Sequence, residues 1–159
     1  MDMAQPKGVG AKEIVIDGEG AILGRMASLI AKLLLNGHRV VVVNAEKVAV
    51  SGDPRMLVEF YRDTVLGVRS HFSHKWRPKR SRSPQRLVIK AVRGMLPKDN
   101  RGEDALSRLR VFVGTPKEYS GKASKLPEGF TAAKLTKAKY ATLGEIARQL
   151  GWKVGASAA

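Results

Sequence analysis

The sequence predicts an α/β protein in which short strands alternate with amphipathic helices. Two β-branched runs, at residues 13–17 and 40–43, flank a helical repeat at residues 23–35. A strand, a helix and a strand within about 30 residues form a βαβ unit, whose strands are parallel and whose crossover is right-handed. At 159 residues the chain is long enough for one sizeable core, so we expect a single α/β domain.

The first strand, EIVID at residues 13–17, ends at a turn that contains Gly18 and Gly20. The next helix has a polar stripe opposite its apolar face, and Gly37 provides a C-terminal stop. Val40–Val43 is an unbroken β-branched run, typical of a strand covered on both faces. The apolar face of the helix consists of Leu23, Met26, Ala27, Ile30, Leu33 and Leu34.

A third strand is predicted at Val48–Val50, and a second helix follows it. Asp53 is a suitable N-cap, and Pro54 suits the first helical position because it has no N–H to leave unpaired. The apolar side of this helix is formed by Leu57, Phe60, Tyr61 and Val65.

The second half of the chain predicts three more helices and a last core strand. Ser83 and Pro84 begin a helix that ends near Gly94. A short helix is expected over residues 103–110, followed by a strand at residues 111–113. Residues 115–139 are loop-like, and the final helix begins with the capping box of Thr142 and Glu145 and ends at Gly151.

The domain organisation predicted from these elements has three parts. Residues 1–12 form a flexible N-terminal tail, because they mix small residues, Pro and Lys without a period. Residues 13–114 form the α/β core, which includes a basic arm at residues 69–82. Residues 115–159 form a lysine-rich C-terminal extension whose terminal helix packs on or beside the core.

Most of the net charge lies in one stretch, residues 69–98. No carboxylate occurs between Asp63 and Asp99, and ten Lys and Arg residues in that interval supply +10 of the total +15. A basic excess of this size favours a polyanionic partner such as nucleic acid. A membrane is a weaker alternative, because no apolar run approaches the roughly 18 residues of a spanning helix.

This basic stretch divides into an arm and a helix. Residues 69–82 show no period, and Phe72 and Trp76 are interleaved with arginines that can bridge phosphates and stack on bases. In the helix that follows, Arg86, Lys90 and Arg93 fall on one face at about 100° per residue. No helix-turn-helix or zinc-finger pattern is present, so RNA is favoured over duplex DNA.

The residues predicted to bind RNA are the charged, histidine and tryptophan side chains of the arm, the basic helix face and the turn beyond it. They are Arg69, His71, His74, Lys75, Trp76, Arg77, Lys79, Arg80, Arg82, Arg86, Lys90, Arg93, Lys98 and Arg101.

Motifs for cofactors, metals and catalysis are weak. The glycines at 18, 20 and 24 miss the dinucleotide-binding spacing by one residue, and no P-loop pattern occurs. His71 and His74 lie among cations that repel a metal ion. From these weak motifs we expect no bound cofactor, no metal and no catalytic site. The chain has no cysteine, and residues 1–8 lack the apolar region of a signal peptide, so we expect a cytoplasmic protein.

Three blocks resemble the large ribosomal subunit protein thirteen family. They are VIDGEGAILGRMASLIAKLLLNG, VVVVNAEKVAVSGDP and AVRGMLPKDNRGEDALSRLRVFVGTP, and the similarity covers roughly residues 14–118. The tail KYATLGEIARQLGWK resembles the archaeal and eukaryotic branch. At the position of the arm, bacterial members of the family have a stretch of different sequence. Contacts known for the bacterial branch are therefore not transferred to residues 69–82.

This resemblance implies a three-layer α/β/α fold around a small, mainly parallel sheet, to which the four predicted strands belong. It also implies a structural, non-catalytic role in the ribosome, with large-subunit rRNA and neighbouring ribosomal proteins as partners. No small-molecule substrate, membrane or homo-oligomer is expected. Two alternatives stay open: a nucleotide-dependent enzyme built on the βαβ unit, and an architectural DNA-binding protein.

Overall fold

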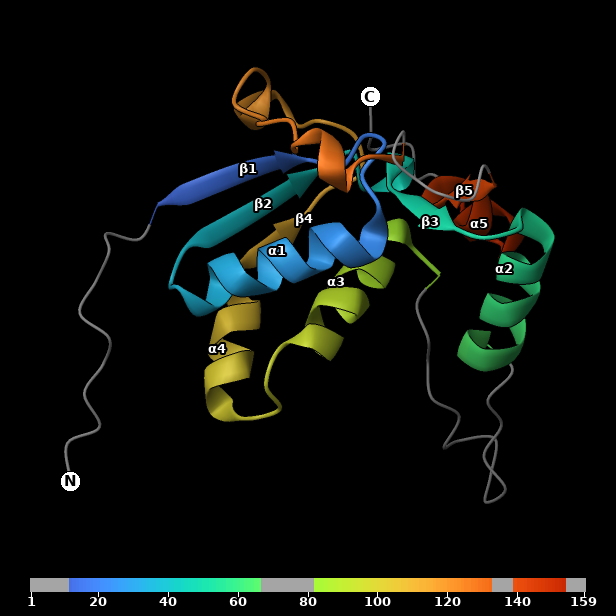
Figure 1. Ribbon diagram of the computed structural model, residues 1–159, viewed down its shortest axis with the longest axis horizontal. Helices are drawn as coiled ribbons and strands as arrows, with labels where there is room; N and C mark the ends of the chain where they lie inside the picture. Colours follow the sequence, from blue (N-terminus) through green and yellow to red (C-terminus); the bar gives the residue numbers. More distant parts are fainter. Residues whose placement is uncertain (1–11, 67–81, 133–138, 154–159) are drawn as a thin grey trace.

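The centre of the fold is a small parallel sheet with strand order β1-β2-β4 (Figure 1). The structure is a computed structural model, and it describes residues 12–66, 82–132 and 139–153. Helices are packed against this sheet, which confirms the predicted α/β class.

Strand β2 (Arg39–Val43) occupies the middle of the sheet. It pairs in parallel with β1 (Glu13–Asp17) over five residues, from Glu13 opposite Arg39 onward, and with β4 (Leu109–Val111) over three. The four valines of β2 are at most 1% exposed, as expected for a strand covered on both faces.

One face of the sheet is covered by three helices: α1 (Leu23–Leu35), α3 (Pro84–Met95) and α4 (Asn100–Ser107) (Figure 1). The helix predicted at residues 23–35 is confirmed as α1. Its apolar stripe meets α3 and the sheet in a core of fully buried side chains that includes Met26, Ile30, Leu34, Val40, Val42, Val88 and Val92. Removing these side chains from water provides most of the stabilisation of this layer.

The other face of the sheet has no helical layer among the described residues. Its buried valines, Val15, Val41 and Val43, pack against Tyr119 and Phe112. Tyr119 belongs to a short 3₁₀ turn, η4 (Lys117–Tyr119), within an irregular segment that pairs at Ser124 with β1. The three-layer arrangement is therefore not confirmed, because a covering segment of this kind replaces the second layer of helices.

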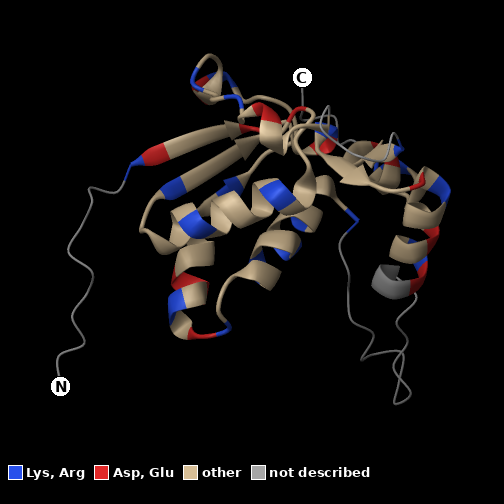
Figure 2. Ribbon diagram, in the orientation of Figure 1, with Lys and Arg blue, Asp and Glu red and all other residues tan. Residues whose placement is uncertain are grey.

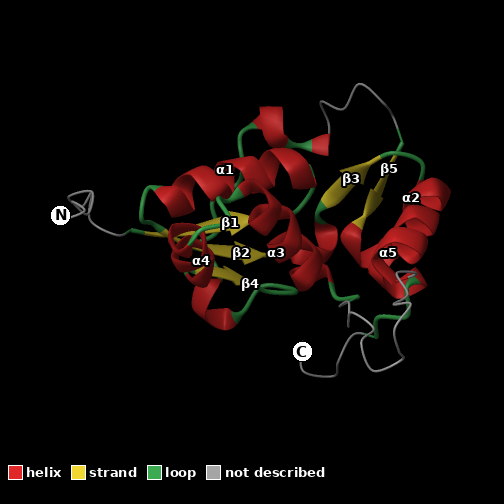
Figure 3. Cartoon of the chain, turned by 90° about the horizontal axis from the view of Figure 1, so that it is seen from below, coloured by secondary structure: helices red, strands yellow, loops and turns green. Residues whose placement is uncertain are grey.

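A second, two-stranded sheet lies beside the first (Figure 3). It consists of β3 (Ala49–Ser51) and β5 (Tyr140–Thr142) in antiparallel pairing, with α2 (Pro54–Phe60) and α5 (Leu143–Gln149) next to it. The prediction that the 48–50 strand joins a four-stranded sheet is wrong.

The chain leaves the main sheet directly after β2. Asn44 adopts a left-handed conformation (φ 56°), and the 3₁₀ turn η1 (Ala45–Lys47) follows it. These two features redirect the chain, so β3 finds its partner in the C-terminal part of the sequence and not beside β4.

The predicted caps of α2 and α5 are confirmed. The backbone N–H of Arg55 donates to Asp53 at the start of α2, and this hydrogen bond holds the pKa of the Asp53 carboxyl below its ordinary value. Thr142 and Glu145 form both hydrogen bonds of the capping box of α5. The α2 helix is shorter than predicted, because a π-helical turn, η2 (Tyr61–Leu66), replaces its last part.

The last helix-to-strand unit of the core is shifted from its predicted position. The helix expected at residues 103–110 runs from Asn100 to Ser107, and the strand expected at residues 111–113 runs from Leu109 to Val111. Arg108 lies between this helix and β4, and its guanidinium donates to the Leu34 carbonyl at the end of α1 (3.0 Å).

The turn between α3 and α4 depends on a close backbone approach at Gly102. This glycine is buried in the first turn of α4, and its N–H donates to the Asp99 carbonyl at 2.8 Å. A Cβ atom at position 102 would overlap the carbonyl oxygen of Pro97. Only glycine therefore allows the Pro97 backbone to lie against α4.

We predict that Gly102→Ala lowers the free energy of unfolding by about 1–3 kcal/mol, because the turn must move to accommodate the methyl group. Chemical denaturation of the purified protein measures the change. Gly94→Ala is the matched control, since it lies in α3 with nothing within 4 Å of the added Cβ. That variant should be neutral or more stable by up to about 1 kcal/mol. Equal losses in both variants would refute the close-approach argument.

Candidate nucleic-acid interface

Helix α3 has one buried face and one basic face. Leu87, Val88 and Val92 are buried against α1 and the sheet. Arg86, Lys90 and Arg93 are all exposed on the outer side, as the spacing predicts. Figure 2 shows these cations along the helix, with no acidic residue within it. The term "basic face" refers below to these three residues.

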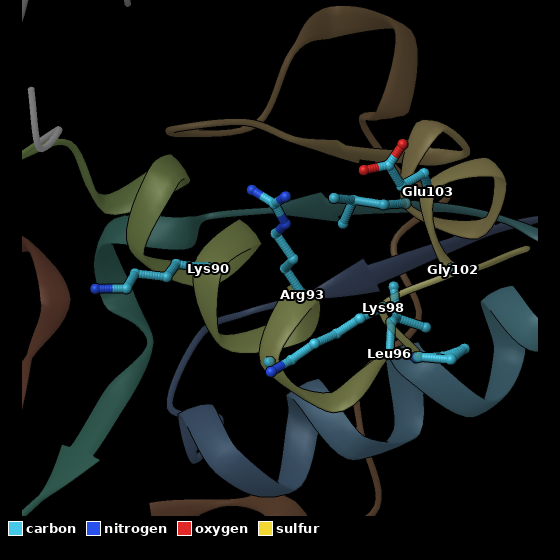
Figure 4. Close-up of a pocket in the computed structure, with 9 residues that line it drawn as sticks. Lys90, Arg93, Leu96, Lys98, Gly102 and Glu103 are labelled. Atoms are coloured by element: carbon cyan, nitrogen blue, oxygen red, sulfur yellow. The ribbon is translucent and has the colours of Figure 1, made fainter. Parts of the chain in front are cut away.

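The basic face continues into a pocket between α3 and α4. The pocket has a volume of about 470 Å³, and the turn with Leu96 and Pro97 forms part of its wall. Figure 4 shows the side chains of Lys90, Arg93 and Lys98 extending from α3 and the turn, with Glu103 on the α4 side. Three cations and one carboxylate give the rim a net positive charge.

Carboxylates do not neutralise this surface within the described residues. The ion pairs found there are Lys47 with Glu19 (3.0 Å) and Lys139 with Asp53 (3.4 Å), both remote from the basic face in the sequence. The cations of α3 therefore remain available to an external anion. Guanidinium groups can bind phosphate through two parallel hydrogen bonds, and ammonium groups add point charges.

The structure describes six of the fourteen residues predicted to bind RNA, and all six are exposed. Lys90, Arg93 and Lys98 line the pocket. Arg86 lies one turn before Lys90 on α3, and Arg101 is on α4. The predicted residues that lie outside the described ranges are Arg69, His71, His74, Lys75, Trp76, Arg77, Lys79 and Arg80.

Arg82 lies apart from the pocket. Its Nη1 atom is 3.0 Å from the position that a Cβ on Gly151 would take, directly after α5. Arg82 therefore lies between the start of α3 and the end of α5.

Two features of the pocket were missed from the sequence. Gly102 holds the Pro97 turn against α4, and Glu103 with Leu106 forms the α4 wall. The predicted helix began at residue 103, so Gly102 lay just before it. Only the observed start of α4 at Asn100 places this glycine inside a helix, where glycine is unfavourable and indicates a steric requirement.

The carboxyl end of the main sheet is the usual ligand position in α/β proteins. Here its polar side chains bond to one another. The Asn44 amide donates to Asp17 (2.9 Å) and the Thr115 hydroxyl donates to Asn44 (3.1 Å). The Gly114 N–H donates to Glu46 (2.9 Å), so this edge is linked across all three strand ends.

The glycine turn after β1 packs against its own chain. The Gly18 N–H donates to the Val43 carbonyl (2.9 Å), and a Cβ at position 18 would lie 2.8 Å from a methyl group of Val48. Gly20 has a positive φ of 66°. These glycines thus serve a tight turn and a close approach.

Among the residues that the structure describes, no group of three or more His, Asp or Glu side chains is arranged to hold a metal ion. No helix in the described ranges is long and apolar enough to cross a bilayer.

Comparisons with known proteins agree with the family named by the sequence blocks. The profile of ribosomal protein L13 matches residues 11–118. A protein of Aeropyrum pernix named large ribosomal subunit protein uL13 is 63% identical over 147 residues, which cover 91% of this chain and 94% of that protein. Its namesake in Archaeoglobus fulgidus is 45% identical over 149 residues, covering 92% and 93%.

The similarity extends to a eukaryote. The protein of the same name in Dictyostelium discoideum is 39% identical over 145 residues, which cover 89% of this chain and 77% of that protein. The profile match includes the main sheet, the basic face and the Pro97 turn, and the relatives are similar over almost the whole chain. The chain belongs to the ribosomal protein L13 family.

Proposed function

We propose that this protein is a structural constituent of the large ribosomal subunit in the cytoplasm and that it binds large-subunit rRNA without catalysing a reaction. The supporting observation is the basic face of α3, which is exposed and not neutralised by any described carboxylate. The relatives that share this chain's sequence are named large ribosomal subunit proteins.

The mechanism is electrostatic and positional. The buried side of α3 anchors the helix to the sheet, so its outer cations have fixed positions relative to one another. Arg86, Lys90 and Arg93 neutralise backbone phosphates and release condensed counterions, which is the main source of affinity. The pocket beside Arg93 and Lys98 receives a further phosphate or sugar group of the folded RNA.

The remaining RNA-binding residues belong to the arm at residues 69–82, and we include them in the proposal on the basis of their composition. Arginines interleaved with Phe72 and Trp76 suit a segment that follows the RNA backbone and stacks on unpaired bases. Arg101 extends the same surface onto α4. Neighbouring ribosomal proteins are the second class of partner.

The first prediction concerns the salt dependence of RNA binding. Replacing Arg86, Lys90 and Arg93 together with alanine should leave the thermal unfolding midpoint within a few degrees of the parent, because all three side chains are exposed. The slope of log affinity against log salt should fall by roughly 2–3, since each phosphate contact contributes about 0.7–0.9. Filter binding to large-subunit rRNA across a salt series measures the slope.

A matched control removes the same charge elsewhere. Lys117, Lys122 and Lys125 are exposed lysines of the loop beyond β4. Their triple alanine variant has the same net charge as the first variant, so it should retain a steeper slope if position matters. Equal slopes in the two variants would show that net charge alone drives binding and would remove the specific role of α3.

The second prediction tests the proposed function directly. The full-length protein should co-sediment with large ribosomal subunits and cross-link to their RNA under ultraviolet light. Protein that remains at the top of the gradient would contradict the ribosomal role. Preference for duplex DNA over structured RNA would favour an architectural DNA-binding protein, and saturable binding of a mononucleotide or dinucleotide in calorimetry would favour an enzyme.

A further inference from the structure

An apolar groove runs along the outer seam between α1 and α3. It consists of two adjoining hollows of about 520 and 490 Å³ that share Met95. We define the α1–α3 groove by the apolar residues Leu23, Leu87, Ala91 and Met95 together with Ala31 and Leu35. Met95 is 45% exposed and lies where the two hollows meet.

The groove has the pattern of a surface that receives another helix. Leu87, Ala91 and Met95 follow one another at four-residue intervals on α3, and Ala31 and Leu35 do so on α1. Leu87 and Ala31 are buried and form the floor, while Ala91, Leu35 and Met95 are partly or fully exposed above it. Together they form an elongated apolar hollow of the kind that binds the apolar face of an amphipathic helix. The small residues Ala91 and Gly94 allow a partner to approach closely, and methionine adapts to its shape.

The charge around the groove defines the partner further. Lys90 lines the first hollow and Lys32 the second, and the residues that line either hollow include no carboxylate. Cations beside an apolar floor match a segment whose apolar side chains are flanked by Asp or Glu. RNA would pair with the lysines but would leave the aliphatic floor without an apolar partner.

Burial at one end of the groove is compatible with this role. Tyr61 lies at the α2 end, packs edge-to-face against Phe60, and burial raises the pKa of its hydroxyl. The rings of Phe60 and Tyr61 thus form an aromatic wall at the α2 end of the groove.

We infer that the α1–α3 groove binds an amphipathic helix with acidic flanks from a neighbouring protein of the large subunit. This inference rests on the proposed ribosomal function and adds the surface and the chemistry of a protein partner. Lys90 then lies at the boundary between the two partners, with rRNA along the basic face and a protein helix along the groove.

The test uses full-length protein in assembled large subunits, with Met95 replaced by the photoreactive residue p-benzoylphenylalanine. After irradiation, mass spectrometry should identify a cross-linked peptide of another ribosomal protein whose apolar residues have helical spacing and whose flanks carry Asp or Glu. The control has the same probe at Met56, which is 71% exposed on α2 and does not line the groove. It should give no link to that peptide.

A second variant adds Ala91→Glu to the protein that carries the probe at Met95. A carboxylate in the apolar groove, facing an acidic partner, should lower the Met95 cross-link at least about tenfold. Met56→Glu should leave it unchanged. Thermal unfolding of both variants shows whether the fold is retained.

The outcomes separate the inference from the function on which it rests. If the protein co-sediments with subunits but Met95 links to RNA, to no protein, or to a peptide without acidic flanks, the groove assignment is wrong and the ribosomal role stands. If the protein fails to join the subunit, both are overturned. A link to an acidic amphipathic segment that Ala91→Glu abolishes supports the inference.

Discussion

The structure depends on the burial of β2 between two parallel neighbours. Its four valines cannot face water on either side, so the chain must supply a cover for both faces. Helices α1 and α3 cover one face, and the segment with Tyr119 covers the other. The basic face, the pocket and the groove all include residues of α3. Because the apolar side of α3 packs against this core, its cations project outward.

The basic face and the groove, in the roles proposed above, assign two partners to one helix. Residues 86, 90 and 93 are charged, whereas residues 87, 91 and 95 are apolar and adjoin them around the helix. The sheet fixes the angle between these two surfaces. Electrostatic attraction sets the affinity of the first surface and depends on salt, while the second depends on apolar burial and shape. A single helix therefore holds a charged surface and an apolar surface at a fixed angle, and the proposed RNA and protein partners would meet it side by side.

Local signals in the sequence predicted much of the fold. The repeat of α1, the Asp53 cap and the Thr142–Glu145 capping box are formed by residues close in the chain, and all are present. The pairing of β3 with β5 was not predictable, because short strands carry no sequence signal for a distant partner. The exposed cations of α3 followed from helical spacing. The pocket did not, since it depends on the steric requirement at Gly102, which becomes visible only when Pro97 is seen beside it.

The separation of the two sheets along the chain has a consequence for synthesis. All three strands of the main sheet have been synthesised once Val111 has emerged, and α3, which packs against that sheet, precedes Val111 in the chain. Strand β3, although made early, meets its partner only when Tyr140–Thr142 appears near the other end of the chain. Because domains are made from the N-terminus onward, the N-terminal half can fold around β2 while β3 still presents an open edge. The basic face is thus made before the segments with Tyr119 and Leu143 that complete the core, so the final packing of α3 waits for the C-terminal part of the chain.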